Sequence, residues 1–365
     1  MIDIPFERFS SLGMTSAVAQ HLSIQPTPPG GPYLLARVIE VHRDALVLHD
    51  GDTAQPARLL PSLARALLEG ASALSVGDWV LCATDAYAQV WVRARLEPLT
   101  HIVRRDGDGL RHSVVSNVDT ALVVMGLDLD FNPQRLERYL ALVHGSGVTP
   151  VVVLSKLDVL LRQGQSPSQQ EPDLLDQRIQ QLRSRIGQRV DLVAVDARDT
   201  DCRKLLAPYL GSGQTLVLLG SSGAGKSTLI NTLTDSSIQD TGHVREHDSR
   251  GKHTTTSRSL HQLPGGACVI DTPGVRTLGL DMDTATLQTL FDDVVALSTQ
   301  CRFRNCQHQD EPDCAVRAGV HPERLRNYQK LLRESRRDTM TPLERQTQLA
   351  QWKVRSRASR ARHSA

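Results

Sequence analysis

The segment GSSGAGKS, residues 220–227, restricts the fold of this chain more than any other feature. It lies between the apolar run QTLVLLG and the run TLINTL, as in a strand–loop–helix unit. Its glycines let backbone N–H groups surround a β-phosphate, while Lys226 reaches the β and γ oxygens and Ser227 offers a hydroxyl to Mg²⁺. The expected nucleotide contacts are Gly220, Ser221, Ser222, Gly223, Ala224, Gly225, Lys226, Ser227 and Thr228. The loop therefore predicts an α/β sheet that binds a nucleoside triphosphate.

Patterns of buried strands alternate with helical patterns from about residue 113 onward. The expected strands are TALVVMGL, VTPVVVLSK, RVDLVAVDA and QTLVLLG. The expected helices are PQRLERYLALVHG, segments near 173–186 and 203–210, and one that begins at about Lys226. This alternation is typical of a doubly wound α/β sheet. We expect the domain to occupy residues 100–280, with a surface loop at 162–172.

The first hundred residues have a different pattern. Residues 1–32 are rich in Ser, Gly and Pro, so we expect a flexible tail there. Residues 33–99 contain short apolar runs separated by turn residues, which predict a small antiparallel β-barrel of the OB type. Such barrels often bind RNA, but aromatic residues make up 4% of the chain, so a structural or protein-docking barrel is an equal alternative.

Two segments after the phosphate loop have the chemistry of Mg²⁺ binding and γ-phosphate sensing. DTPG at 271–274 follows the apolar run ACVI, so Asp271 can hold Mg²⁺ through water and the Gly274 amide can sense the γ-phosphate. GKHTTT at 251–256 is a candidate switch loop, in which a threonine hydroxyl completes the Mg²⁺ shell. Spacing does not decide which threonine does so, and we expect Thr255. A threonine-rich turn without such a role is the alternative.

The segment SKLD, residues 155–158, predicts which base is bound. It follows the apolar strand VVVL, where a carboxylate can accept the N1–H and N2–H donors of guanine, a pair that adenine lacks. The expected base contacts are Ser155, Lys156, Leu157 and Asp158, with Asp196 and Ala197 of VDA as a weaker supporting loop. This segment precedes the phosphate loop, the reverse of the order in ordinary GTPases. The domain is therefore expected to be circularly permuted.

The order SKLD, VDA, GSSGAGKS, GKHTTT and DTPG, after a small barrel and before a Cys/His cluster, resembles the circularly permuted ribosome-assembly GTPases of the RsgA (YjeQ) family. The resemblance extends from Tyr33 to about Tyr328. It implies a GTPase that acts late in assembly of the small (30S) ribosomal subunit, contacts its 16S-type rRNA, and hydrolyses GTP to GDP and phosphate with ribosome-stimulated turnover. Ser155 and Asp196 depart from the family, which usually has Asn or Thr and Ser at these positions.

Val275 follows DTPG at a position where many GTPases have a glutamine that orients the attacking water. An apolar side chain cannot do this. His253 in the candidate switch loop resembles the family's proposed catalytic histidine and is the best candidate for positioning water, with a solvated loop histidine as the alternative. We expect catalysis by His253, Lys226 and Thr255, with Ser227 and Thr255 as Mg²⁺ ligands, and slow turnover until a partner orders the loop.

Three cysteines and a histidine gather in CRFRNCQHQDEPDC, residues 301–314. Cys301, Cys306, His308 and Cys314 can form a closed tetrahedral set for one structural Zn²⁺, and reduced surface cysteines with a chance histidine are the alternative. We expect a mainly helical zinc-binding domain at 281–330 and a basic helix or tail at 331–365. Cys82, Cys202 and Cys268 lie in or near apolar runs and are expected in the core.

The net charge is +2, but positive charge is concentrated near the C-terminus. Twelve Lys or Arg residues and three Asp or Glu residues lie between Arg324 and Arg362. The arginines near the Cys/His cluster, which we expect to meet RNA phosphates, are Arg302, Arg304, Arg317, Arg324 and Arg326. The sequence has neither an apolar run long enough for a membrane span nor a signal-peptide pattern, so we expect a cytoplasmic protein without a membrane partner. Coiled-coil heptads are also absent from it, which favours a monomer.

Two other functions fit parts of this pattern. An ATPase or kinase would use the same phosphate loop, but SKLD argues against it. A non-catalytic or nucleotide-gated RNA-binding scaffold, with the nucleotide as a structural ligand, would fit the missing glutamine after DTPG.

Overall fold

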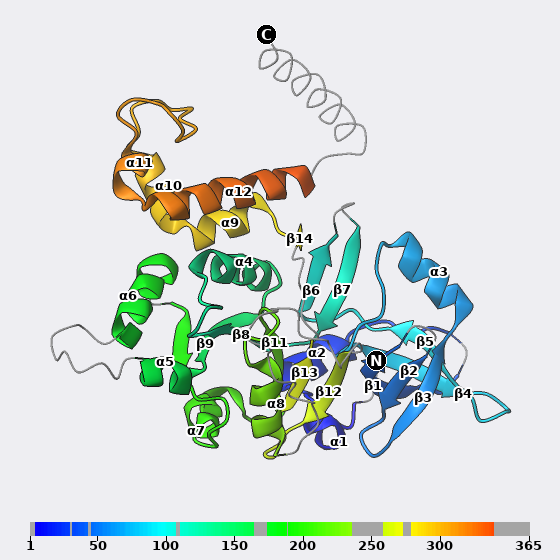
Figure 1. Cartoon of the computed structure of the whole chain (residues 1–365). Helices are drawn as coiled ribbons and strands as arrows, with labels where there is room; N and C mark the ends of the chain where they lie inside the picture. Colours follow the sequence, from blue (N-terminus) through cyan, green and yellow to red (C-terminus); the bar gives the residue numbers. More distant parts are fainter. Residues whose placement is uncertain are drawn as a thin grey trace, which may run out of the picture. The chain divides into compact units, whose positions relative to one another are not determined.

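The structure is a computed structural model that describes residues 4–29, 31–42, 45–106, 110–163, 174–187, 189–235, 258–272 and 279–338 (Figure 1). The chain divides into two compact units, residues 1–279 and 280–365. Within the described ranges, none of the helices is long and apolar enough to cross a membrane.

Six strands of the first unit form a sheet in the order β10-β9-β8-β11-β13-β12. Their bounds are β8 (Thr120–Gly126), β9 (Thr149–Ser155), β10 (Asp191–Ala194), β11 (Thr215–Leu219), β12 (Arg258–Gln262) and β13 (Cys268–Asp271). β12 is antiparallel to β13, and the other neighbours are parallel. Every residue of β8 and β11 is buried, as expected for parallel strands covered on both faces.

Helices cover this sheet on both faces (Figure 1). They are α4 (Pro133–His144), α5 (Leu157–Gln163), α6 (Leu174–Ile186), α7 (Cys202–Leu206), the 3₁₀ helix η1 (Ala207–Tyr209) and α8 (Lys226–Thr234). The sequence marks the start of α4 clearly. Asn132 caps the helix by accepting a hydrogen bond from the Arg135 amide, and Pro133 is favoured at the first helical position. The expected alternation of strands and helices is confirmed. The predicted surface loop at 162–172 lies almost entirely outside the described residues.

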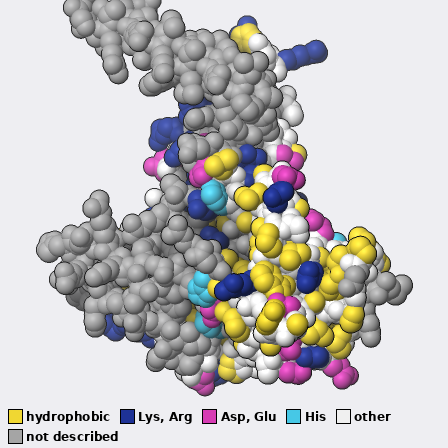
Figure 2. All heavy atoms as spheres, turned by 90° about the vertical axis from the view of Figure 1, so that its right-hand side faces the viewer, with side chains coloured by type: hydrophobic (Ala, Val, Ile, Leu, Met, Phe, Trp, Pro, Cys, Tyr) yellow, Lys and Arg dark blue, Asp and Glu magenta, His cyan; other side chains and the backbone are white. Residues whose placement is uncertain are grey.

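Five strands form a closed barrel in the order β1-β2-β3-β5-β4, with β4 returning to β1. They are β1 (Leu34–Val41), β2 (Leu46–His49), β3 (Ala54–Leu59), β4 (Trp79–Thr84) and β5 (Val90–Arg95), and α3 (Pro61–Glu69) connects β3 to β4. The predicted small barrel is confirmed, but β3 and β5 run parallel, so it is not purely antiparallel. Apolar side chains gather on the barrel side of the first unit, with Lys and Arg among them (Figure 2).

The barrel and the α/β sheet share one continuous eleven-stranded sheet. β1 pairs antiparallel with β12, with Glu40 opposite Ser259 and Val41 opposite Arg258. We expected the barrel at 33–99 and the α/β domain at 100–280 to be separate parts. Both instead belong to one compact unit, because backbone hydrogen bonds between β1 and β12 join them.

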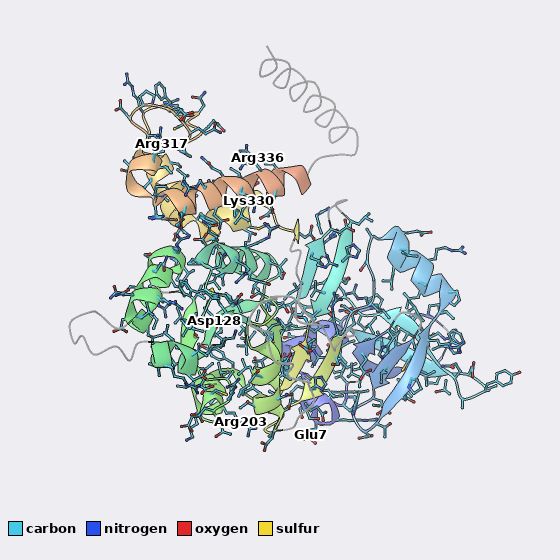
Figure 3. The ribbon with its side chains drawn as sticks, in the orientation of Figure 1. Glu7, Asp128, Arg203, Arg317, Lys330 and Arg336 are labelled. Carbon is cyan, nitrogen blue, oxygen red and sulfur yellow. The ribbon has the colours of Figure 1, made fainter. Side chains whose placement is uncertain are left out.

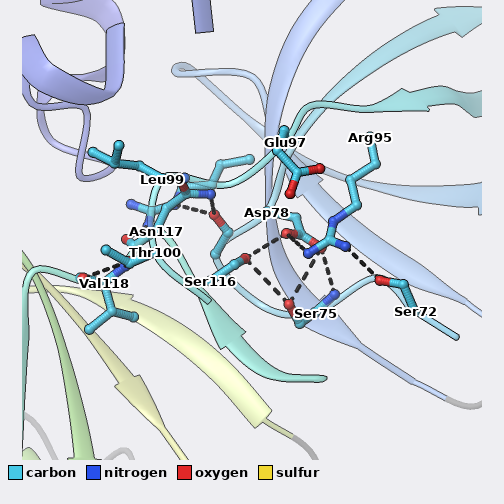
Figure 4. Close-up of polar contacts among 12 residues, drawn as sticks. Ser72, Ser75, Asp78, Arg95, Glu97, Leu99, Thr100, Ser116, Asn117 and Val118 are labelled. Atoms are coloured by element: carbon cyan, nitrogen blue, oxygen red, sulfur yellow. Dashed lines mark hydrogen bonds and ion pairs between the residues drawn. The ribbon is translucent and has the colours of Figure 1, made fainter. Parts of the chain in front are cut away.

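Buried polar side chains reinforce this junction. The Arg37 guanidinium is fully buried and donates to Thr215 Oγ1 at 2.9 Å, to the Asn117 carbonyl at 2.9 Å and to the Leu12 carbonyl. A second network centres on Asp78, whose carboxylate accepts hydrogen bonds from Arg95 at 2.9 Å and from Ser116 Oγ at 2.6 Å (Figure 4). Ser116 ends the hairpin of β6 (His101–Arg105) and β7 (Arg111–Ser116). Burial raises the pKa of Asp78, and Arg95 opposes this shift.

The N-terminal segment is folded, so the predicted flexible tail at 1–32 is wrong for residues 4–29. It contains α1 (Phe6–Ser10) and α2 (Ser16–Ser23), with Thr15 capping α2. Five of its apolar residues are buried against the outer face of the barrel, namely Phe9, Leu12, Met14, Val18 and Leu22, where they meet Leu35, Trp79, Leu81 and Leu96. The Phe9 and Trp79 rings meet edge to face at 5.3 Å. Their burial offsets the entropy of ordering the segment.

The second unit is mainly helical, as predicted. After β14 (Gly279–Leu280) at the boundary come α9 (Thr284–Leu290), α10 (Asp292–Ser298), α11 (Ala315–Gly319) and α12 (Pro322–Asp338). Leu287, Phe291, Val294 and Leu331 are buried. Arg324 is also buried: its guanidinium donates to Asp293 at 2.7 Å and lies over the Phe291 ring at 4.5 Å. The sequence-based proposal that Arg324 meets RNA is therefore wrong, because the side chain is committed to the core.

Candidate nucleotide site and metal centre

The nucleotide motifs lie at the carboxyl edge of the α/β sheet. The phosphate loop follows β11, SKLD begins at the last residue of β9, VDA follows β10 and Asp271 ends β13. The spatial strand order brings these segments to one edge although their chain order is permuted. The sequence motifs therefore meet in one place.

The phosphate loop has the backbone shape that its glycines permit. Gly220 has φ +151°, and a Cβ there would lie 2.3 Å from the Val124 carbonyl oxygen. Gly225 has φ +94° at the N-cap of α8. A side chain at either position would be strained or would clash. The loop thus leads directly into the N-terminus of α8, where free N–H groups favour a bound anion.

Backbone carbonyl groups hold Lys226 at this loop. Its ammonium group donates to the carbonyl oxygens of Gly220 at 2.9 Å and Ser221 at 2.7 Å. Burial lowers the pKa of Lys226 to about 8, although Asp271 and Asp130 act in the opposite direction. A bound phosphate adds negative charge and must raise this pKa again.

Asp271, the carboxylate of DTPG, is the last residue of β13. It is buried, and this burial raises its pKa while Lys226 and His261 oppose the shift. The next residue, Thr272, is fully buried and donates through Oγ1 to the Leu218 carbonyl at 2.6 Å. This bond ties the end of β13 to β11, so Asp271 is held beside the phosphate loop.

The SKLD segment contacts the phosphate loop directly. Ser155 is fully buried, and its hydroxyl donates to the Ala224 carbonyl. Lys156 adopts a left-handed conformation with φ +61°, and its ammonium lies 2.7 Å from an Asp128 carboxylate oxygen. Leu157 and Asp158 begin α5, where the Leu157 amide donates to the Val195 carbonyl at 3.3 Å. Ser155 thus supplies a bond to the phosphate loop despite lacking an amide group.

The VDA segment supports the same edge. The Asp196 carboxylate accepts a hydrogen bond from the Arg198 amide at 2.9 Å, which closes a turn. Ala197 is buried, and its carbonyl accepts from Thr232 Oγ1 of α8 at 2.7 Å. Asp196 is therefore occupied in shaping its own loop.

Three predicted residues fall outside the described part of the chain. His253 and Thr255 of the candidate switch loop and Gly274 of DTPG lie there, as does Val275. Their roles stay predictions. Two residues outside the predicted motifs, Asp128 and Asp130, contact those motifs from the loop after β8 (Figure 3, where Asp128 is labelled). The signal was a pair of acids directly after a buried strand beside the phosphate-loop strand.

The Cys/His cluster converges in the second unit. One ligand atom from each of Cys301, Cys306, His308 and Cys314 lies within 4.8 Å of the others. His308 Nδ1 is 3.6 Å from Cys301 Sγ and 3.5 Å from Cys314 Sγ, and these two sulfurs are 3.9 Å apart. Tetrahedral zinc with bonds of about 2.3 Å separates its sulfurs by about 3.8 Å. The donor set therefore fits one structural zinc ion.

Backbone and side-chain contacts support the cluster. His308 has φ +59°, and its carbonyl accepts a hydrogen bond from Gln329 Nε2 of α12 at 3.0 Å. Cys314 caps α11. The three remaining cysteines, Cys82, Cys202 and Cys268, are buried as predicted, and burial raises each thiol pKa to about 11.

The phosphate loop, SKLD and the acidic end of β13 meet at one sheet edge in permuted chain order. This arrangement defines a circularly permuted phosphate-loop nucleotide hydrolase. The sequence model of the RsgA GTPase family matches residues 96–281. The chain belongs to this family and is a GTP hydrolase.

Named relatives and solved structures agree with this assignment. The chain is 43% identical over 309 residues to the small ribosomal subunit biogenesis GTPase RsgA of Xanthomonas axonopodis pv. citri, covering 82% of this chain and 80% of that protein. The corresponding protein of Xanthomonas euvesicatoria is 44% identical over 306 residues, with the same coverage. The fold is similar to YjeQ from Thermotoga maritima, with a TM-score of 0.58 and 22% identity over 83% of this chain and 99% of that chain. It is also similar to YloQ, a circularly permuted GTPase, with a TM-score of 0.53 and 20% identity over 87% and 100% of the two chains.

Proposed function

We propose that the protein binds the small (30S) ribosomal subunit through its 16S-type rRNA and acts in late assembly of that subunit. It binds GTP with Mg²⁺, hydrolyses it to GDP and phosphate, and turns over faster on the subunit than alone. One structural Zn²⁺ holds the second unit together. The relatives named above, which are small ribosomal subunit biogenesis GTPases, support the role in assembly.

The contact between Ser155 and Ala224 is the main observation that supports binding of a guanine nucleotide. It joins the segment that contains Asp158 to the phosphate loop, so one ligand can reach both. Asp158 lies at the start of α5, and its carboxylate would accept the N1–H and N2–H donors of guanine. Adenine lacks this donor pair. Direct measurement of GDP and ADP affinity tests the assignment, and equal affinities would remove it.

The residues expected around the phosphates have different roles in hydrolysis. Lys226 stabilises negative charge on the β and γ oxygens, and the N-terminus of α8 provides backbone N–H donors. Ser227, Thr255 and Asp271 would hold Mg²⁺, which neutralises phosphate charge when bound. His253 would position the attacking water, because Val275 cannot. The Gly274 amide would sense the γ-phosphate.

Replacement of His253 tests this division of roles. We expect His253→Ala to remove the stimulation of GTP hydrolysis by small subunits while leaving GTP affinity nearly unchanged, since the histidine orients water rather than binding phosphate. GTP turnover is measured with and without purified small subunits. His243→Ala, a change at another histidine before the motif, is the matched control. Equal rates with and without subunits in the unaltered protein would remove the proposed coupling.

The second unit offers a surface suited to an RNA backbone. Arg326, Lys330, Arg333 and Arg336 are exposed on α12 at helical spacing, and Lys330 and Arg336 are labelled in Figure 3. The opposite face of the helix is buried through Leu325, Tyr328 and Leu331. A row of cations on one rigid face matches the charge of RNA phosphates. The zinc cluster anchors this helix through Gln329.

Charge reversal on α12 tests the RNA surface. We expect Arg326→Glu with Lys330→Glu to weaken binding to small subunits and to reduce its dependence on salt concentration, because two phosphate contacts are lost. Lys204→Glu, a change at a highly exposed lysine of the first unit, is the control. Sedimentation with subunits in GDP and in a non-hydrolysable GTP analogue measures both effects. Unchanged binding by the double variant would exclude this face.

We also propose that the protein acts as a cytoplasmic monomer without a membrane partner. The assembly role of the named relatives supports the cytoplasm, where ribosomal subunits are built. Sedimentation of the protein alone tests the oligomeric state.

A further inference from the structure

The loop between β8 and α4, residues 127–132, carries two carboxylates that lie outside all the nucleotide motifs. β8 lies between β9 and β11, so this loop emerges between SKLD and the phosphate loop. We propose that Asp128 and Asp130 are positioning residues: Asp130 fixes the phosphate loop and Asp128 fixes the base-recognition segment. The inference rests on the proposed nucleotide site.

Asp130 is a fixed acceptor for the phosphate loop. One carboxylate oxygen accepts the Ser221 hydroxyl at 2.6 Å, and the other accepts the Gly126 amide at 3.2 Å. Arg135 of α4 also donates to this carboxylate. The side chain is 14% exposed, so its partners rather than water hold it. The positive charge of Arg135 compensates the negative charge of Asp130, so this carboxylate can lie beside a phosphate-binding loop.

The hydrogen bond between Asp130 and Ser221 also affects the position of Lys226. The carbonyls of Gly220 and Ser221 hold the Lys226 ammonium, so the orientation of the Ser221 peptide sets where that ammonium points. Asp130 also acts on Lys226 electrostatically. Because the lysine interacts with charge that develops during phosphate transfer, misplacing it should lower the rate of the chemical step more than ground-state binding.

Asp128 acts on the other side of the loop. Its carboxylate accepts the Lys156 ammonium at 2.7 Å, and both side chains are one quarter exposed. Its other oxygen accepts the Asp130 amide at 3.1 Å, so a single turn builds both acceptors. Glycine at 126 leaves room for this carboxylate, because a Cβ there would lie 2.4 Å from Asp128 Oδ1. When Asp128 holds the ammonium group, the methylene stem of Lys156 is free to pack against the base.

The two carboxylates should therefore have different kinetic signatures. Loss of Asp130 should act on turnover, because it works through Ser221 on Lys226. Loss of Asp128 should act on nucleotide affinity, because packing against the base is the same in the ground state and the transition state. A general loosening of the loop would instead change both parameters in both variants.

Steady-state GTP hydrolysis and GDP affinity of the full chain test the proposal. The variants are Asp130→Ala, Ser221→Ala, their combination, and Asp128→Ala. The matched control is Asp201→Ala. It removes an exposed carboxylate whose ion-pair partner, at 2.8 Å, is the exposed Lys204 rather than a residue of the nucleotide motifs. Ser221→Ala removes one hydroxyl and keeps the test informative if Asp130→Ala does not fold.

We expect Asp130→Ala and Ser221→Ala each to lower kcat by about tenfold with little change in KM, as loss of one charge-assisted hydrogen bond implies. The combined variant should be no worse than either, because both changes remove the same bond. Asp128→Ala should raise KM for GTP and Kd for GDP by about tenfold at unchanged kcat.

Additive losses in the combined variant, or the same change of both parameters in the two aspartate variants, would overturn the proposal. If the unaltered protein binds GDP and hydrolyses GTP while every variant behaves like Asp201→Ala, the positioning role of Asp128 and Asp130 is excluded. The proposed function is then unaffected. If the unaltered protein does not bind guanine nucleotide, both fall.

Discussion

Burial of Lys226 disfavours the charged form of its side chain, and phosphate binding needs that charged form. An ammonium group loses hydration when buried, and this lowers the pKa of Lys226 to about 8, within reach of ordinary buffers. Bound phosphates restore a favourable environment for its charge. Nucleotide binding should therefore be coupled to proton uptake above that pKa.

This coupling predicts a pH dependence of GDP affinity. Below about pH 8 Lys226 is protonated in both states, and affinity should be constant with respect to this group. Above it the free protein loses the proton and must regain it to bind, so affinity should fall by up to about tenfold per pH unit. Calorimetric titration in buffers of different ionisation enthalpy measures the proton uptake.

Lys226→Arg is the control for this prediction. A guanidinium stays protonated across the same range, so the slope that belongs to position 226 should disappear even if affinity is reduced overall. The same slope in both proteins would mean that another group titrates.

At the residue scale, the motifs were predictable because their chemistry is encoded in local spacing. The glycines of the phosphate loop and the carboxylate of SKLD act within a few positions of their strands. Asp130 is not part of any motif, and although two acids directly after a buried strand are a local signal, they do not identify its partner Ser221, which lies 91 positions away. The buried position of Arg324 was missed for the same reason: its partner Asp293 lies on another helix.

The two N-terminal helices, α1 and α2, show how composition can mislead at the scale of elements. Ser, Gly and Pro are concentrated after residue 22, yet the expected tail was extended to the whole of 1–32. Phe9, Leu12, Val18 and Leu22 are apolar and buried. They lie in two short helices and the turn between them, so they give no long periodic pattern. Their burial depends on a barrel face that is not visible in the local sequence.

Substitution in this segment tests its contribution to stability. We expect Leu12→Ala to lower the free energy of unfolding of the first unit by about 2–5 kcal/mol, because the side chain is fully buried and would leave a cavity. Ile24→Ala, at a side chain that is 75% exposed, should cost less than about 0.5 kcal/mol. Urea unfolding of both variants measures the difference, and equal midpoints would show that the helices are not part of the core.

At the scale of the whole molecule, the two units should unfold separately. The first is held by apolar packing and a continuous sheet, whereas the second depends on a small helical core and the Cys/His cluster. Metal binding to such a cluster contributes directly to folding free energy. Removal of the metal should therefore affect one unit alone.

Scanning calorimetry of the purified protein tests this division. We expect two transitions, with a strong chelator or Cys306→Ser lowering the temperature of the transition of the second unit by many degrees. Leu12→Ala should lower the other transition instead. A chelator that shifts both transitions together would show that the units unfold as one.

The number and kind of folded parts could be predicted from sequence, but not how they are joined. Alternating patterns predicted the α/β sheet, short apolar runs the barrel and cysteine spacing the metal cluster. The pairing of β1 with β12 uses backbone hydrogen bonds, for which every residue except proline is equally suited. Sequence therefore gives no sign of it.

That pairing decides where this protein can be cut and recombined. A chimera that exchanges residues 33–99 with those of a relative would place a foreign β1 against the resident β12 and replace Arg37, whose guanidinium reaches Thr215 and Leu12. Among the described residues, all strands of the large sheet precede Gly279, so exchange of the helical segment after β14 leaves the pairings of that sheet intact. For protein engineering, the natural cassette boundary is thus near residue 279, and the barrel should be transferred together with the GTPase sheet and the N-terminal helices.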